Sequence, residues 1–492
     1  MGGQTSGRAV IEGVELSTQH WIGGERAASS ETFPDISPID EETIAQVARG
    51  GADEVDAAVA AGRDAFETWG RTSPKERAEV LHRIADGVEA RVQELAAVET
   101  RDNGSLLRSM RNSVMPRVAR NFRFFADKLV ALQGSADADY DGFGEHVSWD
   151  PAGVTAVITP WNAPLMLATW RLAPALAAGN SVILKPPEWA PLTASMLAEI
   201  AHGAGLPAGA YNVVQGIGEE AGAALTRHPK VDRIAFTGSI ATGRLVAQAA
   251  APNLTPTSLE LGGKSPFLAF ADADLDAVVK QAVNQFDNAG QVCLAGTRLL
   301  IERSVYDTFL ERFAEAAGAI VQGDPRDEAT DVGPLITRGH FDRVDGFVER
   351  AKAEGGRVVF GGGPNEDLGG LFYRPTLFAD VPEGSEILLH EVFGPVLTVQ
   401  AFDDEDEAVA LANATEYGLA AIVYTGDPAR AERVSGRLVA GTVWVNCFFV
   451  RDLNAPFGGS RSSGIGREGG VWSFDFYADV KNVCAAPWDE EG

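Results

Sequence analysis

The sequence is poor in residue types on which several classes of protein depend. Its three cysteines, Cys293, Cys447 and Cys484, lie far apart, and none belongs to a CxxC pair or a cysteine–histidine cluster. This spacing argues against a disulfide framework and against a zinc site, so we expect no metal. Lysine is scarce as well, with eight residues, and the formal net charge is -28. We therefore expect no nucleic-acid partner, because phosphate binding needs a basic surface.

Long hydrophobic runs are also missing. No apolar run is long enough to cross a bilayer, and residues 1–25 lack the basic start and apolar core of a signal peptide. We therefore expect a cytoplasmic protein without a membrane partner. Hydrophobic residues make up 45% of the 492 positions, which predicts a globular chain of two or three domains.

Short apolar segments alternate with helical segments from residue 153 onward. The strand-like segments are GVTAVI, SVILK, YNVVQ and DRIAFTG, and helices are expected at 165–179, 191–203, 219–227 and 241–251. This alternation is typical of an α/β fold whose parallel sheet is covered on both faces, and ligands of such sheets bind beyond the carboxyl ends of the strands. A second series, with RVVFGG, AIVYTG and GTVWVN, predicts another α/β domain at about 265–445. Amphipathic helices are expected earlier, at 53–66 and 76–100, the second opening near SPKE.

Three motifs suggest a phosphate or nucleotide site. GIGREG at 464–469 matches GxGxxG, but no strand leads into it, so we interpret it as a glycine-rich loop. FTGSIATG at 236–243 is a better candidate, because it follows a strand and opens a helix whose N-terminus favours pyrophosphate. LKPPE at 184–188 ends a strand and would place a lysine and a glutamate at the sheet edge. Taken singly, FTGSIATG is explained equally well by an ordinary strand-to-helix turn, and a solvated loop with a surface ion pair is the favoured interpretation of LKPPE.

Cys293 lies among small residues in FDNAGQVCLAG at 286–296. A lone cysteine is more often a buried apolar residue than a nucleophile, so this segment alone leaves both interpretations open.

Read together, seven motifs resemble the aldehyde dehydrogenase superfamily in type, order and spacing. They are TPWNAP at 159–164, LKPPE at 184–188, FTGS at 236–239, LELGGKSP at 259–266, GQVCLAG at 290–296, HEVFGPV at 390–396 and APFGGSRSSGIGREGG at 455–470. The likeness covers nearly the whole chain. It implies NAD(P)-dependent oxidation of an aldehyde to a carboxylic acid.

The resemblance also implies the catalytic residues. The thiolate of Cys293 would attack the carbonyl carbon, and the side-chain amide of Asn162 with the backbone N–H of Cys293 would stabilise the oxyanion. After hydride transfer, Glu260 would activate the water that hydrolyses the thioester. The alternative for Glu260 is a structural pair with Lys264.

NAD is the implied coenzyme. Its implied contacts are Thr159, Pro160, Trp161, Lys185, Glu188, Gly238, Ser239, Leu261, Glu391 and Phe393. Glu188 favours NAD because a carboxylate would repel a 2′-phosphate, although some members of the family also accept NADP.

The implied fold has a Rossmann-like coenzyme domain, an α/β catalytic domain and a small oligomerisation arm. The expected boundaries are 1–128 with 152–261 for NAD binding, 262–461 for catalysis, and 129–151 with 471–492 for oligomerisation or bridging. The acidic stretch ADADYDGFGEH at 136–146 is the expected excursion or bridging arm. The family likeness further implies a homodimer or homotetramer.

Three stretches point to the substrate. MPRVARNFRFFAD at 115–127 and VNCFFVRDLNAPFGG at 445–459 resemble the muconic semialdehyde dehydrogenases within that family. This resemblance implies an aldehyde that also carries carboxylate. REGGVWSFDFYADVKNVC at 467–484 points most to 5-carboxymethyl-2-hydroxymuconate semialdehyde, with 2-hydroxymuconic and 2-aminomuconic semialdehydes as close alternatives. A guanidinium binds carboxylate bidentately, so Arg117 and Arg451 are candidate anchors, with Arg120 in reserve. Interior or interface ion pairs are the structural alternative for these arginines.

Three other functions remain open. The first is a dehydrogenase for succinic semialdehyde, betaine aldehyde or an aromatic aldehyde. The second is a non-catalytic protein of this fold, which the combination of Asn162, Glu260 and Cys293 disfavours. The third is a CoA-acylating enzyme, which would need no water-activating base, so Glu260 weighs against it.

Overall fold

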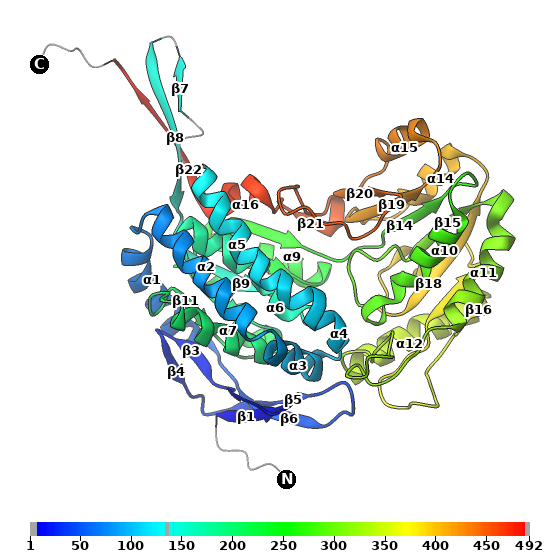
Figure 1. The fold of residues 1–492 in the computed structure, drawn as a ribbon, viewed down its shortest axis with the longest axis horizontal. Helices are drawn as coiled ribbons and strands as arrows, with labels where there is room; N and C mark the ends of the chain where they lie inside the picture. The colour runs from blue at the N-terminus through cyan, green and yellow to red at the C-terminus, as the bar shows by residue number, and fades with distance from the viewer. Residues whose placement is uncertain (1–6, 133–136, 141, 488–492) are drawn as a thin grey trace, which may run out of the picture.

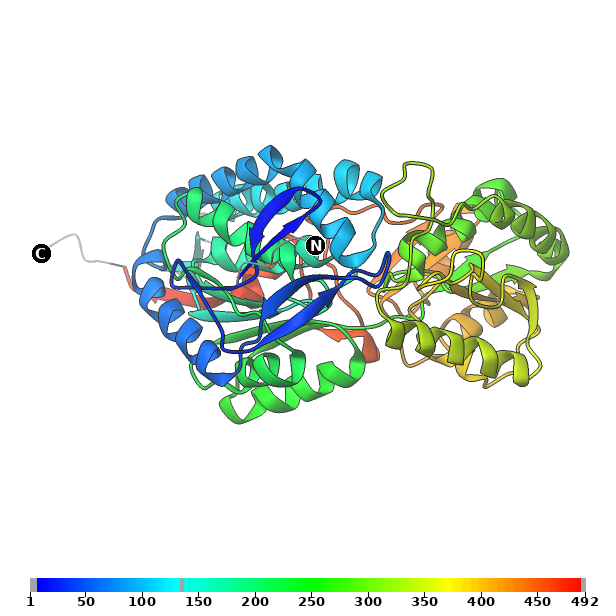
Figure 2. The same ribbon diagram turned by 90° about the horizontal axis from the view of Figure 1, so that it is seen from below.

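A computed structural model describes residues 7–132, 137–140 and 142–487 of the chain. They form two lobes that lie side by side, and a narrow arm projects from one lobe, away from the other (Figures 1 and 2). Each lobe is built around a large sheet, of eight strands in the first lobe and seven in the second. The predicted α/β fold class is confirmed.

The N-terminal strands lie along one side of the first lobe. They are β1 (Arg8–Ile11), β2 (Val14–Ser17), β3 (His20–Ile22), β4 (Glu25–Ala27), β5 (Thr32–Ile36) and β6 (Thr43–Ala48). β3 and β4 extend the large sheet, because Trp21 of β3 pairs with Val213. The other four form two separate hairpins.

The predicted helix at 53–66 is present as α1 (Ala52–Trp69), but the single helix expected at 76–100 is wrong. It is two helices, α2 (Pro74–Ala90) and α3 (Val92–Asn103), separated at Arg91, whose φ of -118° and ψ of 19° leave the helical region. The expected opening at SPKE is confirmed. The Ser73 hydroxyl accepts from the Glu76 amide, and the Glu76 carboxylate accepts from the Ser73 amide at 2.7 Å.

The first sheet has the strand order β21-β13-β12-β9-β10-β11-β3-β4. Its central strands are β9 (Val154–Ile158), β10 (Ser181–Lys185), β11 (Tyr211–Val213), β12 (Arg233–Thr237) and β13 (Thr257–Glu260), and these five are parallel. The edge strand β21 (Gly464–Ile465) pairs antiparallel with β13. The expectation that GIGREG is only a loop is therefore wrong in part, because its first two residues extend the sheet.

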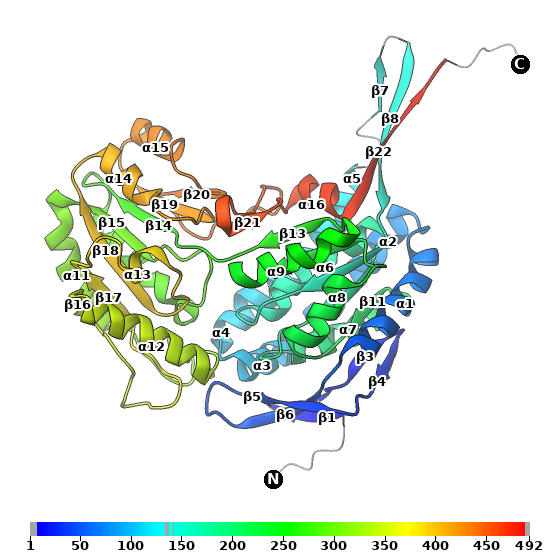
Figure 3. The same ribbon diagram turned by 180° about the vertical axis from the view of Figure 1, so that it is seen from behind.

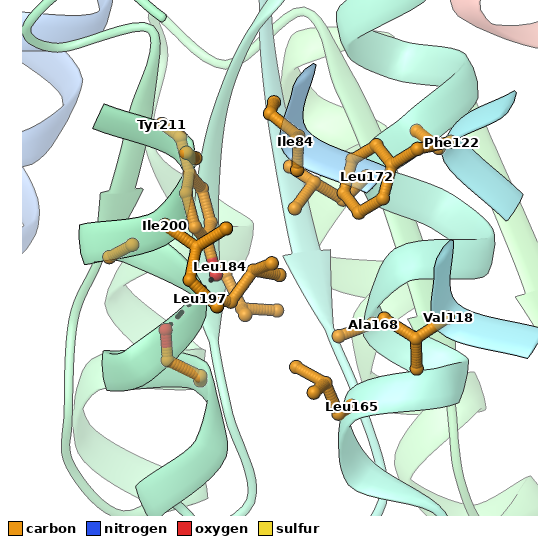
Figure 4. Packing of buried hydrophobic residues seen from close by; sticks show 14 of the residues in the cluster. Ile84, Val118, Phe122, Leu165, Ala168, Leu172, Leu184, Leu197, Ile200 and Tyr211 are labelled. Atoms are coloured by element: carbon orange, nitrogen blue, oxygen red, sulfur yellow. Dashed lines mark hydrogen bonds between the residues drawn. The ribbon is translucent and has the colours of Figure 1, made fainter. Parts of the chain in front are cut away.

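Helices cover both faces of this sheet, as the uninterrupted apolar strands predict. α6 (Pro164–Ala178), α7 (Leu192–Gly203), α2 and α5 (Met115–Leu132) pack on one face, and α1, α8 (Ala223–Arg227) and α9 (Ile240–Ala250) on the other. Leu184 of β10 points to the first face, where it lies beside Leu197 and Ile200, and Leu172 and Phe122 belong to the same core (Figure 4). The neighbouring Ile183 belongs to the core on the opposite face, so successive residues of one strand fill two cores.

The second lobe repeats this arrangement. Its sheet has the order β16-β17-β18-β15-β14-β19-β20, with only β16 antiparallel. The strands are β14 (Pro266–Ala269), β15 (Arg298–Glu302), β16 (Arg357–Phe360), β17 (Thr376–Ala379), β18 (Val396–Phe402), β19 (Ala420–Tyr424) and β20 (Thr442–Val445). The covering helices include α10 (Leu275–Val283), α11 (Tyr306–Gly318), α12 (Arg338–Ala353), α14 (Glu405–Ala412) and α15 (Pro428–Ser435).

The arm is a three-stranded antiparallel sheet of β7 (Asp137–Tyr140), β8 (Phe143–Pro151) and β22 (Ala478–Ala485) (Figure 3). β8 and β22 pair from Pro151 with Ala478 to Gly144 with Ala485. α16 (Gly470–Tyr477) leads into β22 from the first lobe. The predicted bridging arm at 136–146 thus forms strands, while residues 136 and 141 lie outside the described residues. The domain boundaries given above stay a prediction.

Candidate active site

The carboxyl ends of four parallel strands bring the sequence motifs to one edge of the first sheet. TPWNAP follows β9, Lys185 ends β10, Gly238 follows β12, and Glu260 ends β13. Facing this edge, a cavity of about 690 Å³ is lined by residues of both lobes. The cavity therefore lies where the sequence places a ligand site.

Most of the predicted site residues line this one cavity. They are Cys293, Glu260, Asn162, Pro160, Trp161, Gly238, Ser239, Leu261, Glu391, Phe393, Arg117, Arg120 and Arg451. Thr159, Lys185 and Glu188 are not among the lining residues, although all three lie at the same sheet edge.

A tight turn presents Cys293. Asn288, Ala289 and Gly290 in the η4 segment (Asn284–Gly290) all have positive φ, between 51° and 69°. A Cβ at Gly290 would come within 2.1 Å of the Gly394 carbonyl oxygen, so only glycine fits there. Behind the thiol, a Cβ at Gly263 would approach the Cys293 carbonyl oxygen at 2.5 Å. Gly290 and Gly263 therefore allow the backbone to pack closely around Cys293.

The thiol of Cys293 is protonated at neutral pH in this environment. Burial raises its pKa to about 12, and the carboxylates of Glu391 and Glu260 raise it further. Backbone amides oppose this shift, including the Cys293 N–H. A thiolate at Cys293 must therefore form by loss of its proton during reaction, since it is not present at rest.

Asn162 is fixed beside this turn by two hydrogen bonds. Its Nδ2 donates to the Gln291 carbonyl at 2.9 Å, and its own carbonyl accepts from Asn288 Nδ2 at 3.1 Å. One hydrogen of the Asn162 amide group remains for another acceptor. The structure thus brings Asn162 next to the Cys293 turn.

Glu260 is buried, and its Oε1 atom has no hydrogen-bond partner. Burial raises its pKa to about 8, and the carboxylate of Glu468 raises it further, while the guanidinium of Arg171 lowers it. Glu468 and Arg171 form a buried ion pair with each other. A Cβ at Gly458 would come within 2.8 Å of Glu260 Oε1, so the glycine leaves room for this carboxylate.

The structural alternative for Glu260, a pair with Lys264, does not occur among the described residues. The Nζ atom of Lys264 is buried without a hydrogen-bond partner. Burial lowers the pKa of Lys264 to about 7, with Arg298 adding to that effect. Glu260 is therefore positioned by β13, and its carboxylate is not taken up by an ion pair with Lys264.

Ser239 caps α9 at the edge of the cavity. Its hydroxyl accepts from the Thr242 amide at 3.2 Å. The Gly238 amide, expected to face a phosphate, donates instead to the Glu260 carbonyl at 3.0 Å. The Gly238 amide is therefore not free for a phosphate, because it links β12 to β13, and Gly238 stays a predicted coenzyme contact through its place in the cavity lining. Within the described part of the chain, the amides of Ser239, Ile240 and Ala241 have no acceptor, so they supply the anion-binding end of the helix.

Lys185 and Glu188 form an ion pair, with Lys185 Nζ 2.6 Å from Glu188 Oε2. Lys185 is buried and Glu188 is half-buried. Burial lowers the pKa of Lys185, and the charge of Glu188 opposes this shift. The pair thus places one cation and one carboxylate at the end of β10, with two acceptor oxygens suited to ribose hydroxyls.

Glu391 and Phe393 come from the loop before β18. Glu391 Oε1 accepts from the Gly263 amide at 2.9 Å, and a Cβ at Gly262 would approach Glu391 Oε2 at 2.2 Å. Phe393 has a left-handed φ of 59°, and its ring lies 5.3 Å from the Trp161 ring. The glycines of LELGG are needed for this close approach.

Sequence reasoning missed two residues of α12 that hold this loop. The His340 Nε2 atom lies 2.7 Å from the Phe393 carbonyl oxygen, and the His340 ring contacts the rings of Trp161 and Phe393. Arg343 donates to the carbonyls of Glu391 and Val392. Their i, i+3 spacing puts both on one helix face, but the sequence alone does not say what that face meets.

Arg117 and Arg451 lie on the same tryptophan ring. Their guanidinium carbons are 5.3 and 4.9 Å from the centre of Trp170, and Arg451 also covers Phe457 at 4.0 Å. Burial lowers the pKa of each to about 10. No carboxylate lies within ion-pair distance of Arg117, Arg120 or Arg451 in the described residues. The predicted structural alternative, an interior ion pair, is therefore not found there.

Comparisons with known proteins agree with this geometry. A sequence model described as "Aldehyde dehydrogenase family" matches residues 25–483. A 2-hydroxymuconic semialdehyde dehydrogenase of Pseudomonas sp. (strain CF600) is 46% identical, covering 95% of this chain and 99% of that protein. A 5-carboxymethyl-2-hydroxymuconate semialdehyde dehydrogenase of Escherichia coli is 42% identical, covering 92% and 98%. A crystal structure of indole-3-acetaldehyde dehydrogenase with NAD+ superimposes with a TM-score of 0.94 at 39% identity, covering 96% and 97%.

Proposed function

The chain belongs to the aldehyde dehydrogenase family, and we propose that it oxidises an aldehyde that also carries a carboxylate, with NAD as electron acceptor. One observation carries the substrate class. Arg117, Arg120 and Arg451 line the cavity that holds Cys293, and none of them has a carboxylate partner among the described residues. Unpaired guanidinium groups beside a nucleophile favour an anionic substrate.

In the proposed reaction, the Cys293 sulfur bonds to the aldehyde carbon as the thiol loses its proton to solvent water. Asn162 Nδ2 and the Cys293 N–H donate to the oxygen that becomes negatively charged. NAD, when bound, accepts the hydride that leaves this carbon, so that a thioester remains on Cys293. Glu260 then removes a proton from water, the water oxygen bonds to the acyl carbon, and the thiol leaves with a proton.

The coenzyme fits the residues at the sheet edge. Free amides at the N-terminus of α9 suit a pyrophosphate, and the Glu188 carboxylate suits the ribose hydroxyls of NAD. The half-buried carboxylate of Glu391 lines the cavity near Trp161 and Phe393, where it would accept from the other ribose. We propose Thr159, Pro160 and Leu261 as backbone or packing contacts around the same group.

The names of the relatives define the substrate more closely. We propose 2-hydroxymuconic semialdehyde or a close analogue, formed in aromatic catabolism, because the relatives act on muconic semialdehydes. A bidentate guanidinium at Arg117 or Arg451 would hold its carboxylate while the aldehyde reaches Cys293. A screen of this compound against succinic semialdehyde, betaine aldehyde and benzaldehyde, with NAD and NADP and with or without CoA, tests the proposal. Preference for a neutral aldehyde would overturn it.

Replacing Arg451 by Ala should lower kcat/KM for 2-hydroxymuconic semialdehyde by about 10- to 100-fold, because a charge-assisted hydrogen bond to the substrate carboxylate is lost. The value for benzaldehyde should change less than about threefold. Arg437→Ala, which removes a surface guanidinium paired with Asp406, is the matched control. Equal losses for both aldehydes would show that Arg451 does not anchor the carboxylate.

Replacing Glu468 by Gln should shift the pH profile of activity to lower pH. The change removes the anion that raises the pKa of Glu260 and leaves the positive charge of Arg171 close to it. Because Glu260 acts as a base in its ionised form, the acid limb of the kcat profile should move down by about one pH unit. Glu349→Gln, at a surface pair with Lys352, should leave the profile unchanged. An unchanged pH profile in Glu468→Gln would show that Glu468 does not set the pKa of Glu260.

We also propose that the arm joins copies of the chain into a dimer or tetramer. Val480 and Val483 of β22 are 53% and 46% exposed, which leaves apolar side chains for a partner. Light scattering in solution measures the assembly.

No helix in the described part of the chain is long and apolar enough to cross a membrane. A cytoplasmic location stays a proposal.

A further inference from the structure

One acidic side chain lines the cavity without a role in the proposed reaction. Asp287 is exposed and lies among the residues that surround Cys293, Asn162 and the arginines. No basic group lies within ion-pair distance of it in the described residues. The nearby Arg108 is engaged elsewhere, by the Asp331 carboxylate at 2.8 Å and the Glu328 carbonyl at 2.6 Å. Desolvation by the surrounding protein raises the pKa of Asp287, and the charge of Arg108 opposes this shift. A cavity suited to an anion therefore contains a carboxyl group without an ion-pair partner.

The backbone places Asp287 at the end of the cavity where reaction takes place. Its φ of -50° and ψ of 142° break the helical turn just before the positive-φ residues that present Cys293. The next residue, Asn288, donates to the Asn162 carbonyl at 3.1 Å and accepts from Ser105 Oγ at 2.9 Å. These bonds fix the Asp287 backbone relative to Asn162, on the same turn as the nucleophile.

A smaller cavity adjoins this end. It has a volume of about 100 Å³, and three of its lining residues, Asp287, Val292 and Phe449, also line the main cavity. Asp287 is the acidic residue common to the two linings. A substrate branch that left the main cavity toward the smaller one would therefore pass the carboxylate of Asp287.

The chemistry of the candidate substrates makes this position selective. In a muconic semialdehyde whose aldehyde carbon is position 6, a carboxymethyl group at position 5 is attached to the carbon next to the aldehyde. Its carboxylate would lie close to Cys293 when the aldehyde is in place, far from the carboxylate at position 1. Two like charges a few ångströms apart in a partly desolvated cavity repel strongly.

We propose that Asp287 is a specificity-determining residue that excludes substrates with a second carboxylate next to the aldehyde. The arginines bind the distant carboxylate, and Asp287 rejects a negatively charged branch at the reacting end. This inference rests on the proposed function, and it selects the unbranched 2-hydroxymuconic type of substrate over the 5-carboxymethyl type.

The test measures kcat/KM of the full-length enzyme for both semialdehydes with NAD, in the wild type, in Asp287→Asn and in Asp307→Asn. Asparagine keeps the size of the side chain and removes its charge. Asp307 is an exposed aspartate on α11, outside the cavity, so Asp307→Asn controls for the change in overall charge. We expect the wild type to prefer the unbranched substrate by about tenfold or more.

Asp287→Asn should raise kcat/KM for the branched substrate by about tenfold and change the value for the unbranched one by less than about threefold, while Asp307→Asn changes neither. A wild type that prefers the branched substrate, or an Asp287→Asn variant that leaves the ratio of the two values unchanged, overturns the role of Asp287. Turnover of benzaldehyde without turnover of either semialdehyde would overturn the proposed function as well, so the two failures are distinguishable.

Discussion

Replacing Cys293 by Ala should lower aldehyde oxidation by at least about 10⁴-fold, because Cys293 is the only cysteine among the described residues that line the cavity. Asn162 and the arginines would still bind the aldehyde, so its binding constant should change little. NADH formation followed by absorbance measures the loss, and quenching of tryptophan fluorescence by NAD checks that the variant still binds coenzyme. Because Trp161 lines the cavity, quenching of its fluorescence reports binding of NAD at this site.

Cys447→Ala is the matched control, because it removes a half-buried thiol from the same lobe without touching the turn that presents Cys293. It should keep at least about half of the wild-type activity, as expected for a small apolar residue outside the reaction. Substantial activity in Cys293→Ala, or complete loss of activity in Cys447→Ala, would show that Cys293 is not the nucleophile.

Replacing Glu260 by Gln should lower kcat by about 10²- to 10⁴-fold, because an amide cannot take a proton from water. Attack by Cys293 should suffer less, since the Cys293 thiol, even with its pKa raised to about 12, gives up its proton more readily than water, whose pKa is about 15.7. The first turnover should therefore remain visible as a burst of NADH. Rapid mixing measures the amplitude of this burst against the concentration of Cys293.

The pH dependence of the wild type follows from the same carboxylate. Burial raises the pKa of Glu260 to about 8, and only the ionised form can accept the proton. The steady-state rate should therefore rise about tenfold per pH unit below pH 8 and level off above it. Glu260→Gln should lose this acid limb. A wild-type rate that falls on going from pH 6 to pH 8 would contradict the assignment of the base.

Much of the site could be predicted from the sequence, because its residues lie at the ends of apolar strands or in motifs shared with a family. Asn162, Lys185 and Glu260 each follow or end a parallel strand, and such ends meet at one sheet edge. The residue types at the carboxyl ends of the parallel strands therefore indicate the chemistry of the site before any side-chain contact is known.

Other features depend on contacts between segments far apart in the chain, and the sequence could not predict them. The Gly238 amide is taken by the Glu260 carbonyl, which depends on strand pairing. The pKa of Glu260 depends on Glu468 and Arg171, which are separated from it by more than 80 residues each way. The same holds for His340 and its contact with Phe393.

The helix expected at 76–100 was mispredicted because a local break interrupts a regular pattern. The periodicity of 76–100 is that of one amphipathic helix, yet Arg91 ends α2 and begins α3. α2 packs mainly on α5, while α3 packs mainly on α7 and on residues 110–114, and these contacts with other segments cannot be seen in the periodicity of 76–100.

Mass spectrometry of Glu260→Gln mixed with NAD and 2-hydroxymuconic semialdehyde tests the central claim most directly. The variant should form the thioester quickly and hydrolyse it slowly, so one acyl group should accumulate per chain. Peptide mapping should locate this group on Cys293 alone. An acyl group on Cys447 or Cys484, or NADH formation with no covalent adduct on any cysteine, would contradict Cys293 as the nucleophile and Glu260 as the base.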